Sequence, residues 1–323
     1  MISRIALALS AVMAAVIAAA PAAAQTYPAR PVRMIVAFAP GGPLDIHARI
    51  VGQKLGEAWG QSVVIENRGG ATGTIGADLV AKAPADGYTV LANASAHVIV
   101  PALMAKLPYD PIKDFAPVTV MGSAPLLLAV TPTLPAKTVK ELVALGKARP
   151  GELAFGSGGA GTSTHLSGEL LKTATGVKMT HVPYKGSGAA MLDVVAGHVP
   201  MTFSSITAAV ELLKARRVRA IAITSEKRYP QLPDLPTFAE SGYKSLTIGS
   251  WYGIWLPAKT PEAVVSKFNA DAVRVLNLPD VRARFSELGG EPVGNTPAQF
   301  DAFQKAEMVR WAKVVKDSGA KPE

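Results

Sequence analysis

The sequence predicts an α/β protein with two lobes, each a mainly parallel sheet flanked by helices. From residue 31 onward, short apolar runs typical of strands alternate with segments of helical period, a pattern that indicates parallel strands covered by helices. The alternation occurs twice, before and after a connection rich in proline (Pro101, Pro108, Pro111 and Pro117). The length of 323 residues also fits about two domains.

The first series contains three strands and two helices. The strands are expected at 32–38, 62–65 and 88–92. Pro40-Gly41-Gly42-Pro43 ends the first strand and opens a helix, in which Ile46, Ile50, Val51, Leu55 and Trp59 recur at helical spacing. The second helix is expected at 74–83, before a turn at Asp86-Gly87.

The second series begins at Leu126. Strands are expected at 126–130, 153–155, 179–182, 199–203 and 219–224, and helices at 138–148, 164–175, 189–196 and 206–215. Thr138 and Glu141 have the spacing of a capping box at the start of the first of these helices. A strand at 246–256 and helices at 261–276 and 297–316 complete the chain, and we expect them to pack onto the first series. Two lobes with the chain crossing between them form a cleft that can close on a ligand.

The first 24 residues have the pattern of a secretory signal. Arg4 precedes an apolar run from Ile5 to Ala20, and Ala22-Ala23-Ala24 forms an A-x-A cleavage site before Gln25. The run is short for a membrane span, and no later segment reaches about 18 uninterrupted apolar residues. We therefore expect cleavage at this site and export of the chain from the cytoplasm.

Composition excludes several classes of site. The chain has no cysteine, which excludes disulfides, thiol nucleophiles, iron–sulfur clusters and zinc–thiolate centres. Lys and Arg total 33 against 24 Asp and Glu, a net charge of +9. The densest basic run, 214–219, has no interleaved aromatic residues, so it indicates a solvated helix end and no nucleic-acid partner. A diffuse positive field can steer small anions.

Two glycine loops follow strands and precede helices. Residues 156–161 match G-x-G-x-x-G, but no acidic residue follows at the position that would bind a ribose, which argues against a dinucleotide cofactor. A glycine loop at a helix N-terminus can instead present amides to a carboxylate, although a plain tight turn remains an alternative. The second loop is Ala39–Asp45, where Asp45 either contacts a ligand or ties down first-turn amides.

Catalytic patterns are weak. No G-x-S-x-G elbow occurs, and Ser163 and His165 are two positions apart at a helix start, so they point to different faces. The five histidines are dispersed, without the spacing of a metal site. The sequence therefore predicts a binding protein with no cofactor and no metal, and a periplasmic hydrolase using Ser163 is the alternative.

Several motifs together resemble one family. Residues 38–45 (FAPGGPLD), 64–68 (VIENR), 85–88 (ADGY), 183–186 (PYKG), 197–198 (GH), 233–237 (PDLPT) and 250–253 (SWYG) occur in order and at matching separations. They resemble the Bug family, the periplasmic solute-binding receptors of tripartite tricarboxylate transporters. The resemblance spans nearly the whole chain after residue 24.

The resemblance implies a Venus-flytrap receptor with one lobe at 25–126 plus 250–323 and the other at 127–249. It would bind a small organic carboxylate between a loop from each lobe, largely through backbone amides and hydroxyls, as a monomer. It would then present the closed form to membrane permease subunits, and an orphan role reporting to a signalling protein stays open. The implied ligand-binding residues are Phe38, Pro40, Gly41, Gly42, Asp45, Asn93, Ser95, His97, Ser157, Gly158, Gly159, Thr162, Ser163, His165, Tyr184, Lys185, Ser204 and Ser205.

Two positions depart from the family pattern. His47 stands where an apolar residue is usual, and Ser204 stands where an aspartate is frequent. These departures concern recognition of the end of the ligand away from its carboxylate. The sequence therefore leaves mono-, di- and tricarboxylates, amino acids and aromatic acids open as ligands.

Overall fold

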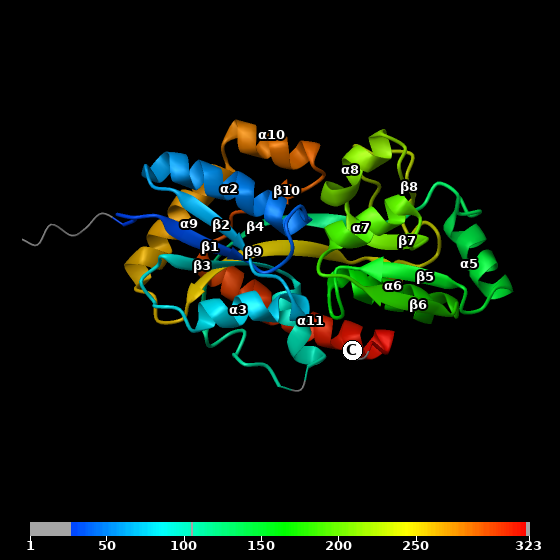
Figure 1. Cartoon of the computed structure of the whole chain (residues 1–323), viewed down its shortest axis with the longest axis horizontal. Coiled ribbons are helices and arrows are strands. Elements are labelled where there is room, and N and C mark those ends of the chain that lie inside the picture. The colour runs from blue at the N-terminus through cyan, green and yellow to red at the C-terminus, as the bar shows by residue number, and fades with distance from the viewer. Residues whose placement is uncertain (1–26, 105, 321–323) are drawn as a thin grey trace, which may run out of the picture.

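Two α/β lobes lie side by side in the computed structural model, which describes residues 27–104 and 106–320 (Figure 1). The expected signal segment, 1–24, lies outside the described residues. None of the described helices has the length and apolar character needed to cross a membrane.

The elements follow the alternation expected from the sequence, with several additions. The strands are β1 (Val32–Val36), β2 (Val63–Asn67), β3 (Thr89–Ala94), β4 (Phe115–Val130), β5 (Leu153–Ser157), β6 (Met179–Pro183), β7 (Met201–Ser205), β8 (Arg219–Ile223), β9 (Gly249–Pro257) and β10 (Glu291–Pro292). The α-helices are α2 (Pro43–Trp59), α3 (Thr74–Ala81), α4 (Ala96–Ile99), α5 (Val139–Ala148), α6 (Ser163–Thr175), α7 (Ser187–Ala196), α8 (Ile206–Lys214), α9 (Glu262–Leu276), α10 (Pro279–Glu287) and α11 (Pro297–Ser318). Short 3₁₀ turns lie at η1 (Ala71–Gly73), η2 (Val100–Ala102) and η3 (Lys244–Leu246).

One long strand joins the sheets of the two lobes. In the first lobe, β2, β1 and β3 are parallel neighbours, β9 is antiparallel to β3, and the first part of β4 is antiparallel to β9. In the second lobe, β6, β5 and β7 are parallel, and the end of β4 lies antiparallel between β7 and β8. Within β4 the pairing changes from Pro125 with β9 to Leu126 with β7. The lobe limits 25–126 plus 250–323 and 127–249 stay a prediction.

The first half of β4 was not predicted as a strand. Pro117, Gly122 and Pro125 interrupt its apolar pattern, and such residues normally indicate strand ends or connections. The strand accommodates them through register shifts between Pro117 and Thr119 and between Val120 and Gly122. Helix α10 was also missed, although Pro279 begins it and Val281 and Phe285 share its buried face.

The expected capping box at α5 forms only in part. Thr138 Oγ1 accepts from the backbone amide of Glu141 at 3.1 Å. The Glu141 carboxylate accepts from the amide of Lys137 at 2.7 Å instead of from Thr138.

The helices cover both faces of the joined sheet, and one face has a continuous core. On that face, residues of α3, α11 and α6 form a single apolar cluster that includes Trp255, Phe300 and Trp311 in the first lobe and Phe155 in the second. On the other face the lobes have separate clusters, one beneath α2, α9 and α10 and one beneath α7 and α8. The lobes are therefore packed together along one side of the sheet.

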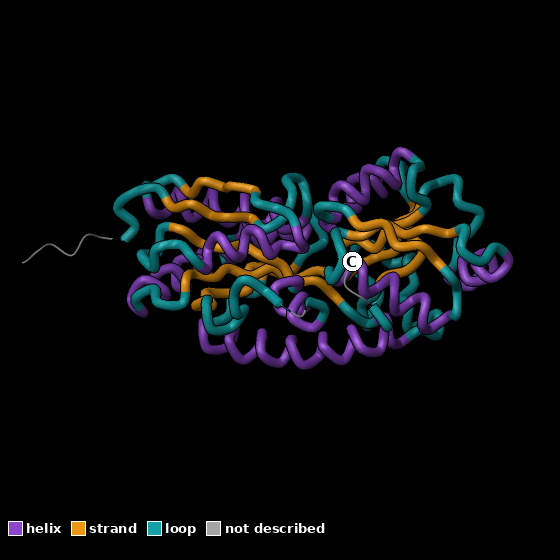
Figure 2. Tube along the Cα trace, turned by 60° about the horizontal axis from the view of Figure 1, so that its bottom comes forward, coloured by secondary structure: helices purple, strands orange, loops and turns teal. Residues whose placement is uncertain are grey.

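Helix α11 extends beneath both lobes (Figure 2). Its first half packs on the first lobe, as expected. Its C-terminal end reaches α6 of the second lobe, where Thr173 Oγ1 donates to the Ser318 carbonyl at 3.2 Å. The last helix is therefore a third connection between the lobes, besides β4 and the segment that leads from β8 to β9.

Candidate ligand-binding site

A small closed cavity of about 50 Å³ lies between the lobes, where strand ends of both sheets meet. The described residues that line it are all uncharged. They are Phe38, Ala39, Gly42, Pro43, Leu44, Ala94, Ser95, Ala96, Leu126, Thr162, Ser163, Thr164, Gly186, Ser187, Ser205, Ser250 and Tyr252. Any charge on a ligand must therefore be balanced by backbone dipoles and hydroxyl groups.

Four helices of nine or more residues begin at this cavity. Its walls include the first residues or N-caps of α2, α6, α7 and α8. The N-caps of α2, α7 and α8, which are Gly42, Gly186 and Ser205, make no side-chain capping hydrogen bond. The opening amides of a helix have no intrahelical acceptor, and its N-terminus carries a partial positive charge. Helix starts from both lobes therefore favour an anion in the cavity.

The hydroxyl of Ser205 adds a side-chain group to this arrangement. It is buried at the start of α8, beside the Tyr252 phenol, with which it interacts. Burial raises the pKa of the neighbouring cavity residue Tyr252 to about 12, so its phenol stays protonated at neutral pH. Both groups can donate a hydrogen bond to a carboxylate.

The first glycine loop is held in place by Asp45. Its carboxylate accepts from the Gly41 amide at 3.0 Å, from Arg49 Nε at 2.9 Å and from Asn67 Nδ2 at 2.9 Å. Burial alone would raise the pKa of Asp45, but these hydrogen bonds bring it below its usual value. Asp45 is thus an ionised group that fixes the loop, while Gly42 and Phe38 of the same segment line the cavity. Pro40 and Gly41 do not.

The second loop satisfies most of its own amides. Gly158 N donates to Thr164 Oγ1 at 3.0 Å, Gly159 N to Ser157 Oγ at 3.1 Å, and Gly161 N to His165 Nδ1 at 3.1 Å. Of these six residues, only Thr164 lines the cavity.

The loop therefore presents its helix start to the cavity. As the first residues of α6, Ser163 and Thr164 have amides without an intrahelical acceptor, and both line the cavity together with Thr162. Thr162 Oγ1 caps the helix by accepting from His165 N at 3.3 Å.

The predicted site residues after β3 lie in two places, the cavity wall and the protein core. Ser95 lines the cavity, whereas Asn93 and His97 lie behind it. His97 Nε2 bonds to the Pro111 carbonyl at 2.9 Å, and its Nδ1 lies 3.4 Å from Asn93 Nδ2. Burial lowers the pKa of His97 to about 4. His97 is thus a neutral core residue with both ring nitrogens engaged.

The remaining predicted residues do not line the cavity. Tyr184 donates its hydroxyl to Asp193 at 2.6 Å, and Ser204 is buried on the opposite face of β7 from Ser205. Lys185 contributes its backbone carbonyl to a contact between the lobes, where it accepts from Ala39 N at 3.3 Å.

Other contacts hold the lobes closed over the cavity. Thr72 Oγ1 donates to the Ala160 carbonyl at 2.6 Å. On the far side, Gln231 Nε2 donates to the Ser286 carbonyl. The structure is therefore the closed form of the cleft.

Eleven lining residues are absent from the ligand-binding residues expected from the sequence, although Ala39, Pro43 and Leu44 lie within the predicted loop Ala39–Asp45. The others are Ala94, Ala96, Leu126, Thr164, Gly186, Ser187, Ser250 and Tyr252. Ser250 and Tyr252 belong to a motif used to recognise the family, so that motif was the available signal. Ala94 and Ala96 flank the predicted Ser95, Thr164 follows the predicted Ser163, and Gly186 and Ser187 follow the predicted Lys185. Leu126 lies on β4, where no site residue was predicted, and only the three-dimensional structure brings it to the wall.

His47, one of the two departures from the family pattern, lies directly behind the cavity. Its ring stacks on Tyr252 at 4.8 Å, and its Nδ1 lies 2.6 Å from the carbonyl of Pro43. Its Nε2 is buried without a hydrogen-bond partner, and burial lowers the pKa of His47 to about 4. His47 therefore supports two lining residues without touching the cavity.

Comparison with known proteins settles the family. Residues 47–320 match the model of the tripartite tricarboxylate transporter family receptor. The chain belongs to this family. BugT of Bordetella pertussis is 38% identical over 305 residues, covering 94% of each chain. The expected resemblance to Bug proteins is confirmed.

Solved structures agree with this assignment. R. palustris Rpa4515 with adipate is 39% identical and superposes with a TM-score of 0.89, covering 92% of this chain and all of that one. MatC from Rhodopseudomonas palustris with bound malate is 35% identical with a TM-score of 0.86, covering 90% and 100%. The periplasmic binding protein BugD is 36% identical with a TM-score of 0.89, covering 92% and 100%. The expected two-lobed binding-protein fold is confirmed.

Proposed function

We propose that this protein is a periplasmic receptor that binds a small organic carboxylate in the interlobe cavity and delivers it to the permease of a tripartite tricarboxylate transporter. The observation that carries the proposal is the convergence of four helix N-termini on a cavity without charged side chains. The adipate and malate bound to two relatives support the same ligand class.

The location of those helix starts favours a ligand with negative charge at both ends. Helix α2 comes from the first lobe, and α6, α7 and α8 come from the second. A dicarboxylate can place one carboxylate toward each lobe and so draw the lobes together. Because the cavity of about 50 Å³ is smaller than a usual small-molecule site, the lobes must close less tightly around such a ligand than in this structure. Ala94, Ala96 and Leu126 supply the apolar part of the wall between them.

Calorimetric titration tests this proposal. The purified protein is titrated with adipate, malate, acetate and the diamine putrescine, and native mass spectrometry identifies any acid that co-purifies. We expect at least one dicarboxylate to bind more tightly than acetate, and putrescine not to bind. Tighter binding of putrescine than of every acid would overturn the proposal.

We infer that binding occurs without turnover. Ser163 lines the cavity, but the neighbouring His165 Nδ1 accepts the Gly161 amide and is unavailable as a base for it. Ser157 lies 2.6 Å from His181 Nε2, yet Ser157 is buried outside the cavity lining and its hydroxyl also contacts the Gly159 backbone. We expect no hydrolysis of p-nitrophenyl acetate beyond the background rate. Hydrolysis that Ser163→Ala abolishes would favour the hydrolase alternative.

A further inference from the structure

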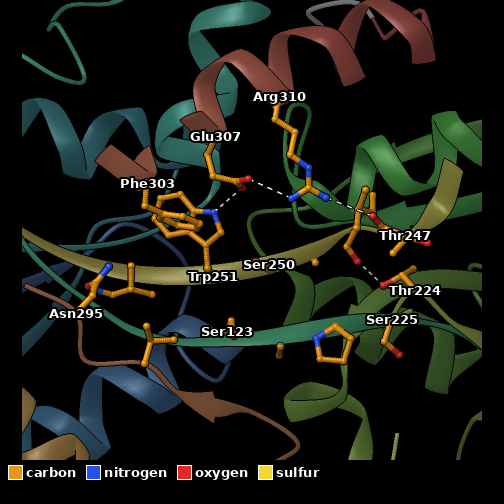
Figure 3. Close-up of a pocket in the computed structure, with 16 residues that line it drawn as sticks. Ser123, Thr224, Ser225, Thr247, Ser250, Trp251, Asn295, Phe303, Glu307 and Arg310 are labelled. Atoms are coloured by element: carbon orange, nitrogen blue, oxygen red, sulfur yellow. Dashed lines mark hydrogen bonds and ion pairs between the residues drawn. The ribbon is translucent and has the colours of Figure 1, made fainter. Parts of the chain in front are cut away.

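A second, larger cavity lies on the other face of strand β9 (Figure 3). Trp251 and Tyr252 are consecutive in this strand, so their side chains point to opposite faces. Tyr252 lines the closed ligand cavity, Trp251 lines the second cavity, and Ser250 borders both. We call the second one the hinge cavity, because its wall includes the parts of β4 and β9 that cross between the lobes.

The hinge cavity has a volume of about 430 Å³, within the range of small-molecule sites. Residues of both lobes form its wall. They are Val120, Ser123, Ala124, Pro125, Thr224, Ser225, Thr247, Ile248, Gly249, Ser250, Trp251, Val293, Asn295, Phe303, Glu307 and Arg310.

The acceptor groups at one end of the hinge cavity are already engaged. Glu307 Oε2 accepts from Trp251 Nε1 at 2.9 Å and from Trp311 Nε1 at 2.8 Å. Glu307 Oε1 accepts from Arg310 at 3.1 Å (Figure 3). The amide oxygen of Asn295 accepts from the Val120 amide at 2.8 Å. A ligand that brings hydrogen-bond donors therefore finds the Glu307 carboxylate and the Asn295 amide oxygen already engaged.

Arg310, in contrast, has donors to spare. A guanidinium group carries five N–H donors. Arg310 uses Nη1 for Glu307 and Nη2 for the Thr247 carbonyl at 3.3 Å, and half of its side chain is exposed. Its remaining donors can bind an oxyanion with the fork geometry that suits a carboxylate.

An apolar wall stands beside this cation. Trp251 and Phe303 meet edge to face at 5.2 Å, and Pro125, Ile248 and Val293 extend the surface. Phe303 is 37% exposed and Val293 46% exposed, so this wall faces solvent at the mouth of the cavity. An aromatic or branched hydrocarbon group fits such a wall.

We propose that the hinge cavity is a second binding site, for an acid with an apolar body, and that its occupancy favours the closed form. The carboxylate binds Arg310 and the apolar group packs on Trp251 and Phe303. A rotation of the lobes about the shared strands β4 and β9 that closes the Tyr252 face would widen the Trp251 face, within the limit set by the contact of Arg310 with the Thr247 carbonyl. A ligand that binds the closed form better shifts the population toward that form.

Phenylacetate is the probe for this site, with phenethylamine as its cationic counterpart. Binding is followed by calorimetry and by the Trp indole N–H signals in NMR spectra. We expect phenylacetate to bind, to shift the Trp251 indole signal, and to bind more tightly than phenethylamine. Equal binding of the two compounds would overturn the assignment of an acid.

Substitutions in the wall of the hinge cavity test whether phenylacetate binds there. Arg310→Gln and Phe303→Ala should each weaken phenylacetate binding at least about fivefold while thermal melts show a folded protein. Arg284→Gln is the matched control, because Arg284 is a half-exposed helical arginine paired with Glu287 away from the hinge cavity. If Arg310→Gln and Phe303→Ala both bind phenylacetate like the parent, the hinge cavity is not the site.

The coupling to closure has its own test, which needs no cleft ligand. Thr72 lies outside the hinge cavity and bridges the lobes through its bond to Ala160. Thr72→Val should weaken closure and so lower the affinity for phenylacetate about two- to fivefold. An unchanged affinity for phenylacetate in Thr72→Val would overturn the coupling to closure. Both tests of the hinge cavity stay valid even if none of the acids titrated under the proposed function binds in the interlobe cavity.

Discussion

At the level of single residues, most polar side chains near the cleft hydrogen-bond to other protein groups and do not line the cavity. Asp45 and His97 have all their strong hydrogen-bonding atoms engaged by neighbouring protein groups. The groups left for a ligand are hydroxyls and backbone amides at helix starts, such as those of Ser205 and Ser163. Substitutions at the cavity wall should therefore act through shape and amide access more than through charge.

Substitutions of Gly42 test whether the shape of the cavity wall controls ligand binding. Its φ of −81° is accessible to any residue, and a Cβ there would lie 3.6 Å from the Ala39 carbonyl and 4.0 Å from the Gly188 amide of the other lobe. Gly42→Ala should therefore bind ligand nearly like the parent. Gly42→Val places two further methyl groups between the lobes, and we expect at least about a tenfold loss of affinity.

Calorimetry and thermal melts compare the parent with these two Gly42 variants. The melting temperature should change little, because Gly42 lies in a loop at the cavity and outside the cores. Parent-like binding by Gly42→Val would contradict closure over the carboxylate at this loop. Gly159 is a poorer position for such a test, because its φ of +122° makes any side chain strained.

His97 should make stability depend on pH. Its folded pKa of about 4 lies below the unfolded value of about 6.5, so the unfolded state binds the proton more readily between these values. The free energy of unfolding should therefore fall as pH decreases from 6.5 to 4, by up to about 3 kcal/mol from this residue. Urea unfolding at several pH values measures the slope.

The slope should be smaller in His97→Leu, even though this variant is less stable overall. Tyr109→Phe is the packing control, because its ring stacks on His97 at 6.1 Å without titrating in this range. Equal slopes in the parent and His97→Leu would show that protonation of His97 does not control acid unfolding.

Among the secondary-structure elements, the N-termini of four helices line the cavity, whereas helix α11 packs against both lobes. The starts of α2, α6, α7 and α8 make the cavity positive without any charged side chain. Helix α11 instead joins the lobes, and Glu307 attaches it to β9 through Trp251. This attachment is buried, since Glu307 is only 6% exposed, so its loss should be costly.

Glu307→Gln should lower the free energy of unfolding by about 1–3 kcal/mol. The amide offers one acceptor oxygen where the carboxylate serves Trp251, Trp311 and Arg310 with two. Glu287→Gln is the matched control, because Glu287 forms an exposed pair with Arg284 and should change stability by less than about 0.5 kcal/mol. Urea unfolding compares the two, and equal small effects would refute the role assigned to Glu307.

At the scale of the whole molecule, closure depends on a few polar contacts between two sheets that share strand β4. Thr72 donates to the Ala160 carbonyl, and the Ala39 amide donates to the Lys185 carbonyl. Both hydrogen bonds join the lobes beside the cavity. The continuous core beneath α11 keeps the lobes together on the other side. Ligand affinity should therefore include the free energy of forming these closing contacts.

Thr72→Val should weaken binding of the cleft ligand about three- to tenfold, because it removes one hydrogen bond present in the closed form. The β-branched shape is kept, so local packing changes little. Calorimetry gives the affinity, and small-angle X-ray scattering compares the radius of gyration with and without ligand. Thr133→Val, on an exposed loop, is the control. Identical affinities in Thr72→Val and the parent would argue against closure through this contact.

Patterns in the amino-acid sequence were enough to predict the α/β fold and to identify the family. Alternating periodicity located most strands and helices, because the apolar face of each element must meet a core and its spacing shows in the chain. It also predicted that both glycine loops face a ligand, since ligands of open α/β sheets bind beyond the carboxyl ends of strands. In the second loop, only the residues at the helix start line the cavity. Phe38, Gly42, Ser95, Thr162, Ser163 and Ser205 are predicted site residues that line the cavity.

Which polar residues line the cavity depends on contacts that exist only in the folded molecule. Asn93, His97, Ser157 and Asp45 have suitable chemistry, but their partners come from residues 2 to 24 positions away and leave no atom free for the cavity. The first half of β4 was not predicted because prolines interrupt its pattern, and Tyr252 reaches the cavity because β9 pairs with β3 and β4. Such pairings join residues far apart in the chain, so local sequence patterns carry no record of them.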